Sequence, residues 1–191
     1  MTNSAEWYQA WGAATHLYRH LSAGGEPQPV FTPVRLAPGE TSYSDVTLTY
    51  SRFYAMDVGY ETNSGFFFGS PLFVAAGLAA NAVGNSMARN RAEQLAAPQW
   101  REHCAARTVV TDRRTLCFAA GRWLSFDHDS VVEFTADPPR AVCFLNFAAA
   151  EPLCLAGFSA PWLTVLLARF LYGAERLPQL PYLRPFATSP L

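Results

Sequence analysis

Six short β-favouring runs follow one another between residues 107 and 157, and they constrain the fold more than any other feature of the sequence. They are rich in Val, Leu, Phe, Thr and Cys, and they read RTVVT, RTLCFA, GRWLSF, SVVEFTA, AVCFLNF and PLCLAG. Turn-forming residues such as Asp, Gly and Pro stand between most of them. Short strands joined by such short turns predict an antiparallel meander.

Other periodic segments flank this meander. Residues 1–25 predict an amphipathic N-terminal helix, because apolar residues recur there at helical spacing. Residues 45–53, DVTLTYSRF, alternate apolar and polar residues and predict an earlier strand. Residues 159–173 predict a helix with Ser159 as N-cap and Gly173 as its stop, placed to cover one open end of the sheet.

Proline and glycine divide the rest of the chain. We expect an irregular Pro/Gly-rich linker at 26–40 and a Pro-rich C-terminal tail at 176–191, the tail extended and packed on the body of the protein. Residues 41–175 then form one domain, interrupted by a helical insertion at 66–97. The predicted class is α+β.

The insertion begins with the most apolar stretch of the chain, GFFFGSPLFVAAGLAANAVGN. No charge occurs from residue 66 to residue 83, which is just long enough for a membrane span. However, Gly69, Pro71 and several alanines dilute its hydrophobicity, and the flanking strands must pair on one side of any membrane. A long helix that starts at Ser70 fits the pattern better.

Three roles for this insertion remain open. It can pack within its own fold, as most contiguous apolar segments do. It can also bind another copy or a partner through a stripe of small residues, formed by Ala76, Ala80, Gly84 and Ala88. Finally, it can dock on a membrane surface or a partner through aromatic side chains, those of Phe66, Phe67, Phe68 and Phe73.

The order of these segments resembles bacterial pleckstrin-homology-like (PH-like) domains of actinobacterial type, including the GRAM-like variety. The resemblance covers residues 36 to 173 and includes LAPGE at Leu36 to Glu40, TDRR at Thr111 to Arg114, and PQWR at Pro98 to Arg101. It implies a strongly bent antiparallel sheet or split barrel, capped by the C-terminal helix. The implied role is the binding of lipid headgroups, peptides or other copies of the domain.

Charge decides among those ligands. Lipid-binding members place several Lys or Arg on the first strands, whereas residues 43 to 61 offer only Arg52, so protein interaction is favoured over phosphoinositides. A net charge of -1 without a basic stripe argues against nucleic acid. One basic cluster near a turn is the first candidate for an acidic ligand, and it consists of Arg113, Arg114, Arg122 and Trp123.

Catalytic motifs are weak. Asp127, His128 and Asp129 could in principle bind a metal or act as acid and base, but a solvated turn explains them more simply. The four cysteines lack metal-site spacing and are expected to be buried thiols. We therefore expect no cofactor and no metal.

The predicted function is a non-catalytic binding or assembly module that acts through protein–protein contacts and forms a homo-oligomer. A peripheral membrane or lipid-binding protein is the alternative, and a metal-dependent enzyme centred on Asp127, His128 and Asp129 is a further one. Without a charged and then apolar leader at its start, the chain is expected in the cytoplasm, either free or associated with a membrane.

Overall fold

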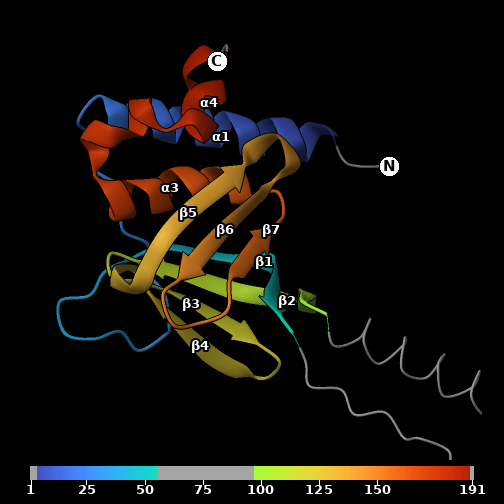
Figure 1. The fold of residues 1–191 in the computed structure, drawn as a ribbon. Helices are drawn as coiled ribbons and strands as arrows, with labels where there is room; N and C mark the ends of the chain where they lie inside the picture. The colour runs from blue at the N-terminus through green and yellow to red at the C-terminus, as the bar shows by residue number, and fades with distance from the viewer. Residues whose placement is uncertain (1–3, 56–96, 190–191) are drawn as a thin grey trace, which may run out of the picture. The chain divides into compact units, whose positions relative to one another are not determined.

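Seven strands form one sheet in the order β4-β3-β2-β1-β7-β6-β5 (Figure 1). The structure is a computed structural model that describes residues 4–55 and 97–189. The chain divides into two units, one formed by residues 1–53 and 100–191 and the other by residues 54–99. The predicted insertion at 66–97 falls in the second unit, almost wholly outside the described residues, and everything below concerns the first.

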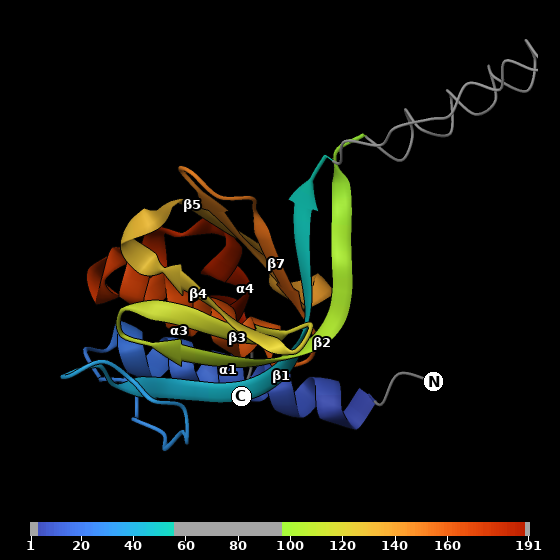
Figure 2. The ribbon, with the colours of Figure 1, turned by 90° about the horizontal axis from the view of Figure 1, so that it is seen from below.

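Two antiparallel meanders make up the sheet, as the short runs predict. One contains β2, β3 and β4, the other contains β5, β6 and β7, and β1 joins them by pairing with β7. Figure 2 shows that β2 bends sharply along its length. The predicted α+β fold with a bent antiparallel sheet is confirmed. The strands are β1 Ser42–Tyr54, β2 Gln99–Thr111, β3 Arg114–Ala119, β4 Arg122–Asp127, β5 Val131–Asp137, β6 Val142–Phe147 and β7 Leu153–Ala156.

Helices cover one side of the sheet (Figure 1). Helix α3, Ala160–Tyr172, packs on β5 and β6, and α1, Ser4–Ser22, packs against α3. Because α3 has neighbours on both sides, it is buried almost all round, from Leu163 to Ala168 without interruption. Such a helix is apolar on every face, whereas α1 buries one stripe, as its sequence predicts.

The ends of the predicted C-terminal helix are partly confirmed. Pro161 lies in the first turn of α3 and Gly173 follows its last residue with a positive φ of 87°. Ser159 is the N-cap residue, as predicted, but its backbone is helical and its side chain makes no capping hydrogen bond. An N-cap side chain reaches the first N–H groups only from a non-helical backbone.

The predicted extended tail is also wrong in conformation. Residues 174–188 form short helices instead: two 3₁₀ helices, η3 at Ala174–Gln179 and η4 at Pro181–Leu183, and then α4 at Arg184–Thr188. Proline fixes a φ that suits a first helical turn as well as an extended segment. Burial of Phe186 against Trp11, with ring centroids 4.7 Å apart, accompanies the helical choice, so the predicted packing on the body is confirmed.

Two further findings bear on the sequence predictions. Within the described residues, no helix is long and apolar enough to cross a membrane. All four cysteines are free thiols, and Cys117, Cys143 and Cys154 are buried while Cys104 is partly buried.

Candidate functional site

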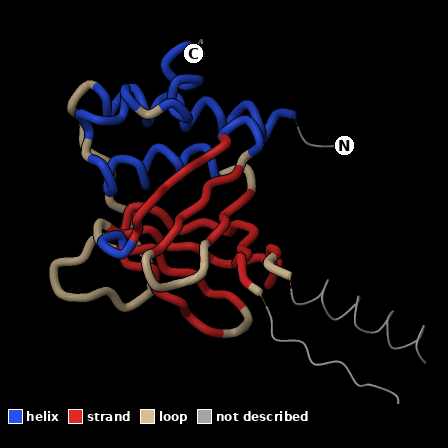
Figure 3. Tube along the Cα trace, viewed as in Figure 1, coloured by secondary structure: helices blue, strands red, loops and turns tan. Residues whose placement is uncertain are grey.

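The linker before β1 is irregular, as predicted, and Figure 3 shows it as a long loop. Two carboxylates, one at the end of the linker and one on β1, bind arginines on the outer face of the sheet, the face away from α3. Glu40 lies at the end of this linker. Its side chain is 1% exposed and accepts hydrogen bonds from Nε and Nη2 of Arg114, both at 2.8 Å. The Thr111 hydroxyl at 2.8 Å and the Ala37 N–H at 2.7 Å complete its partners. These bonds, led by Arg114, lower the pKa of Glu40 to about 2.

Asp45 on β1 makes the second such contact. Its two oxygens accept hydrogen bonds from Nε and Nη2 of Arg107, at 2.8 and 2.6 Å, and one also accepts from Thr32 of the linker at 3.0 Å. The Arg107 guanidinium lowers the pKa of the Asp45 carboxyl. Each arginine therefore binds its carboxylate through Nε and Nη2, on one edge of the guanidinium group, and Nη1 lies on the other edge.

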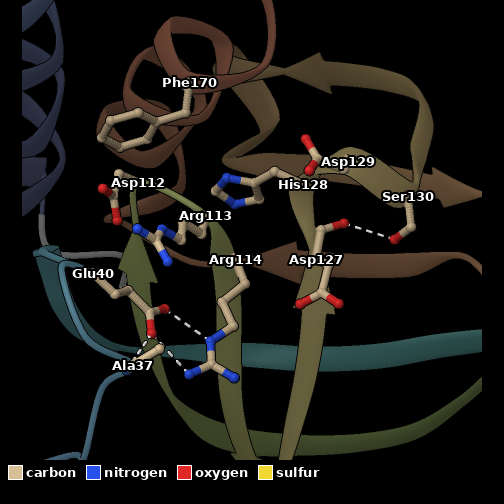
Figure 4. A pocket seen from close by; sticks show the side chains of 10 residues that line it. All are labelled: Ala37, Glu40, Asp112, Arg113, Arg114, Asp127, His128, Asp129, Ser130 and Phe170. Carbon is tan, nitrogen blue, oxygen red and sulfur yellow. Dashed lines mark hydrogen bonds and ion pairs between the residues drawn. The ribbon is translucent and has the colours of Figure 1, made fainter.

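A first pocket of about 580 Å³ lies at the turns between β2 and β3 and between β4 and β5 (Figure 4). We call it the turn pocket. Four carboxylates line it against two guanidinium groups, so its surroundings are net negative while His128 is neutral. It is therefore poorly suited to an anionic ligand. Its lining residues are Ala37, Glu40, Asp112, Arg113, Arg114, Asp127, His128, Asp129, Ser130 and Phe170.

His128 lies at the inner side of the turn pocket. Its ring is buried, stacks on Phe170 with centroids 6.2 Å apart, and places Nε2 at 3.2 Å from the Thr115 hydroxyl. Burial lowers the pKa of His128 to about 4, against the opposing effect of the nearby Asp127 and Asp129 carboxylates. The imidazole is thus neutral at pH 7.

Asp127, His128 and Asp129 do not form a metal-binding group. Figure 4 shows the two carboxylates pointing in opposite directions, with the histidine packed inward between them. Across residues 4–55 and 97–189, no group of three or more His, Cys, Asp or Glu is arranged to hold a metal ion. The geometry therefore gives no support to the metal-dependent alternative at this turn.

A second pocket of about 460 Å³ lies on the outer face, between the linker and the strands β2, β3 and β4. We call it the arginine groove. Three guanidinium groups and an indole line it, and none of the lining residues that the structure describes is acidic. Trp123 is 41% exposed and its ring lies 5.3 Å from that of Phe118. The lining residues are Pro33, Val34, Arg35, Arg107, Arg114, Leu116 and Trp123.

The predicted basic cluster does not stay together. Arg114 lies opposite Asp127 at one end of the β3–β4 hairpin, whereas Arg122 lies opposite Ala119 at the other end. These positions are five residue steps apart along each strand, which corresponds to about 17 Å at the usual rise of a strand. Arg114 and Trp123 line the arginine groove, and Arg113 lines the turn pocket, where its Nη2 donates to the Gly39 carbonyl at 3.3 Å.

Sequence reasoning missed Arg35, Arg107 and the carboxylates Glu40 and Asp45. Glu40 is separated from Arg114 by 74 residues, and Asp45 from Arg107 by 62, so no local spacing connects them. The one available signal was Glu40 at the end of LAPGE. The predicted stripe from Ala76 to Ala88 and the aromatic set from Phe66 to Phe73 lie outside the described residues.

No protein-family model matches this chain, and no curated protein sequence matches it either. A functional assignment therefore depends on the geometry of the two pockets and of the sheet that carries them.

Proposed function

We propose that this chain is a non-catalytic binding module of the PH-like kind, which binds an acidic segment of a partner protein in the arginine groove. The seven-strand bent sheet, its two meanders joined through β1, and the helix after the last strand support the PH-like part of this proposal. These are the features that the resemblance in sequence implies.

The lining of the arginine groove is the observation that carries the proposal. Arg107 and Arg114 are each held in place by two hydrogen bonds to a carboxylate, so they lose little side-chain entropy when a ligand binds. Arg35 is exposed and takes part in none of the ion pairs found among the described residues. With two carboxylates facing three guanidinium groups, the groove keeps a net positive charge.

Trp123 and Leu116 add an apolar part to the same groove. Leu116 is buried beneath the linker, while the indole of Trp123 remains partly open to solvent. Exposed aromatic and arginine side chains together are typical of protein-binding surfaces. A segment with acidic and apolar residues would contact both parts of the groove.

The titratable groups of the site favour binding over catalysis. Burial raises the pKa of the Cys117 thiol to about 12 and raises that of Cys143 further, so neither is a thiolate at pH 7. His128 is neutral but its ring is buried, with Phe170 stacked on it. These groups do not present an activated nucleophile and base to a ligand.

The test is a binding assay with short labelled peptides of equal length and apolar content, one acidic, one basic and one neutral. We expect the acidic peptide to bind, and we expect Arg35→Glu to weaken its binding by about tenfold at low salt. Arg35→Glu removes no ion pair found in the described part of the chain, so the fold should tolerate it. Arg176→Glu on η3, also exposed and outside the groove, is the matched control and should change the affinity little.

Equal binding of all three peptides, or an equal loss of affinity in Arg35→Glu and Arg176→Glu, would refute the groove as an acidic-ligand site.

The insertion has two separate proposals. One is self-association through Ala76, Ala80, Gly84 and Ala88, and the other is membrane docking through the aromatic set. Light scattering on Ala80→Leu and Gly84→Leu tests the first: a mass equal to that of the unmodified chain excludes the stripe. Co-sedimentation with neutral and anionic vesicles tests the second.

A further inference from the structure

The two edges of the sheet are protected very differently. β5 ends the strand order on one side, where α3 and η4 pack beside it and the Tyr172 hydroxyl accepts a hydrogen bond from the Phe134 N–H at 3.2 Å. β4 ends the order on the other side, where β3 is the one described strand that pairs with it. Proteins usually shield such an edge, because its free N–H and C=O groups can pair with another chain.

The direction of the free groups on β4 follows from the ladder with β3. His128 N–H, just after β4, donates to the Arg113 carbonyl at 2.9 Å, so even-numbered residues of this strand direct their backbone groups toward β3. The two-residue turn before β4, with Ala120 and Gly121 both at positive φ, gives the same alternation. The N–H and C=O groups of Trp123, Ser125 and Asp127 therefore point away from the sheet, and the Asp127 carbonyl already accepts a hydrogen bond from the Ser130 hydroxyl at 2.7 Å.

Only part of the usual protection occurs on this edge: β4 is short, and its charged residues stand only at its two ends, at Arg122 and Asp127. β4 reads RWLSFD, without proline, and its pairing with β3 runs without a bulge from one end to the other. Its outward-facing residues include Trp123, which lies beside another exposed aromatic residue, Phe118. An unshielded edge with exposed aromatic side chains is suited to accept an extended segment as an additional strand.

We propose that the partner segment binds as an added β-strand along β4, with its acidic side chain opposite Ser125. This inference rests on the proposed function and specifies how the ligand of the arginine groove is held. Nη1 of Arg114 lies 3.5 Å from the Ser125 hydroxyl, so this guanidinium extends from β3 over β4 toward the open edge. Nε and Nη2 of Arg114 each donate to Glu40 and Nη1 donates to Ser125, so a second N–H on Nη1 and one on Nη2 remain for a ligand carboxylate.

The neighbouring positions on the same face define the rest of the motif. A ligand residue opposite Trp123 contacts the indole and should be apolar, whereas one opposite Asp127 faces a carboxylate and should be basic. Side chains on one face of a strand recur at every second residue. The ligand is therefore an extended segment whose alternate residues are apolar, acidic and basic, in that order along the edge from Trp123 to Asp127.

The experiment uses the full chain and a short capped peptide in which Leu, Glu and Lys alternate with threonines. The peptide is made in both sequence orders, Leu-Glu-Lys and Lys-Glu-Leu. We expect at least one direction to bind, and N-methylation of its backbone at the residue opposite Ser125 to weaken binding by about tenfold or more, since the ladder hydrogen bonds there are lost. On the protein, Ser125→Pro removes an outward N–H, as proline on an edge strand can do without disrupting the ladder. Ser125→Ala, which keeps that N–H, is the matched control.

The outcomes separate this inference from the proposed function. In one outcome, binding depends on Arg35 and on the peptide's Glu but is unchanged by N-methylation and by Ser125→Pro. This outcome overturns strand addition and leaves the arginine groove as an acidic-ligand site. Absence of binding both by the acidic peptide of the first assay and by the peptide with Leu, Glu and Lys overturns both. If the unmodified chain is a dimer by light scattering and Ser125→Pro makes it a monomer, a second copy occupies β4 and the acidic ligand is refuted there. N-methylation leaves the protein unchanged, so the test remains valid if Ser125→Pro fails to fold.

Discussion

Replacing Glu40 by glutamine should destabilise the fold strongly at neutral pH and hardly at all in acid. The carboxylate is 1% exposed and accepts four hydrogen bonds, two of them from Arg114. Glutamine has the same shape, but its amide group offers donors where the site supplies donors, and it leaves the Arg114 guanidinium without its anion.

The pKa of Glu40 sets the magnitude. A fall in the pKa from 4.5 to about 2 on folding corresponds to about 3 kcal/mol. The Arg114 side chain is 27% exposed, so solvent screens part of this interaction and we expect Glu40→Gln to cost about 2 kcal/mol at pH 7. Because the folded state binds fewer protons than the unfolded state between pH 4.5 and 2, this stabilisation is complete above pH 4.5 and is lost as the pH falls toward 2.

Urea unfolding of the unmodified chain and of Glu40→Gln, followed by far-UV circular dichroism across this pH range, measures the difference. Glu26→Gln is the matched control, since Glu26 also pairs with an arginine, Arg169, but its side chain is 73% exposed; we expect its cost to stay below about 1 kcal/mol. A Glu40→Gln cost as small as that of Glu26→Gln at pH 7, or one that persists undiminished near pH 2, would refute the reasoning.

Three other predictions follow from single residues. His128→Gln keeps a nitrogen for Thr115 but cannot titrate, so it should remove the part of the stability loss that His128 causes as the pH falls from 6.5 to 4. An unchanged loss of stability between these pH values in urea unfolding would contradict this. Ala120→Gly should raise the melting temperature, with a stabilisation of about 0.5–1 kcal/mol, because Ala120 has a positive φ of 50°; a lower melting temperature would count against it. A thiol reagent at neutral pH should label Cys104 well before Cys117, and equal rates on the folded chain would show that the buried thiol is accessible.

The strands were predictable because each carries its own local pattern. Every β-favouring run in residues 107–157 forms part of a strand, since β-branched and aromatic residues fit a pleated, half-buried surface wherever short turns separate them. The first part of β2, residues 99–106, was not predicted. It contains charged residues and alanines of low strand propensity, and it becomes a strand by continuing the ladder beside β1.

The site was harder to predict than the fold. Arg114 and Trp123 were singled out because they stand near turns, but Arg35 and Arg107 gave no comparable signal. They line one groove because the linker folds back over the outer face of β2 and β3. This contact joins segments far apart in the sequence, so no local sequence pattern predicts it. The separation of Arg113 and Arg122 from this groove likewise depends on strand register, which fixes the position of every side chain along the hairpin.

The Glu40–Arg114 pair connects the stability of the fold to the proposed site. It holds the end of the linker, which forms one wall of the arginine groove, and it orients the guanidinium whose Nη1 extends over Ser125. A substitution of Glu40 therefore changes stability, the shape of the groove and the donors free for a ligand at once. Arg35 and the backbone of Ser125 lie outside this pair, so substitutions there measure binding without the loss of stability that a change at Glu40 brings.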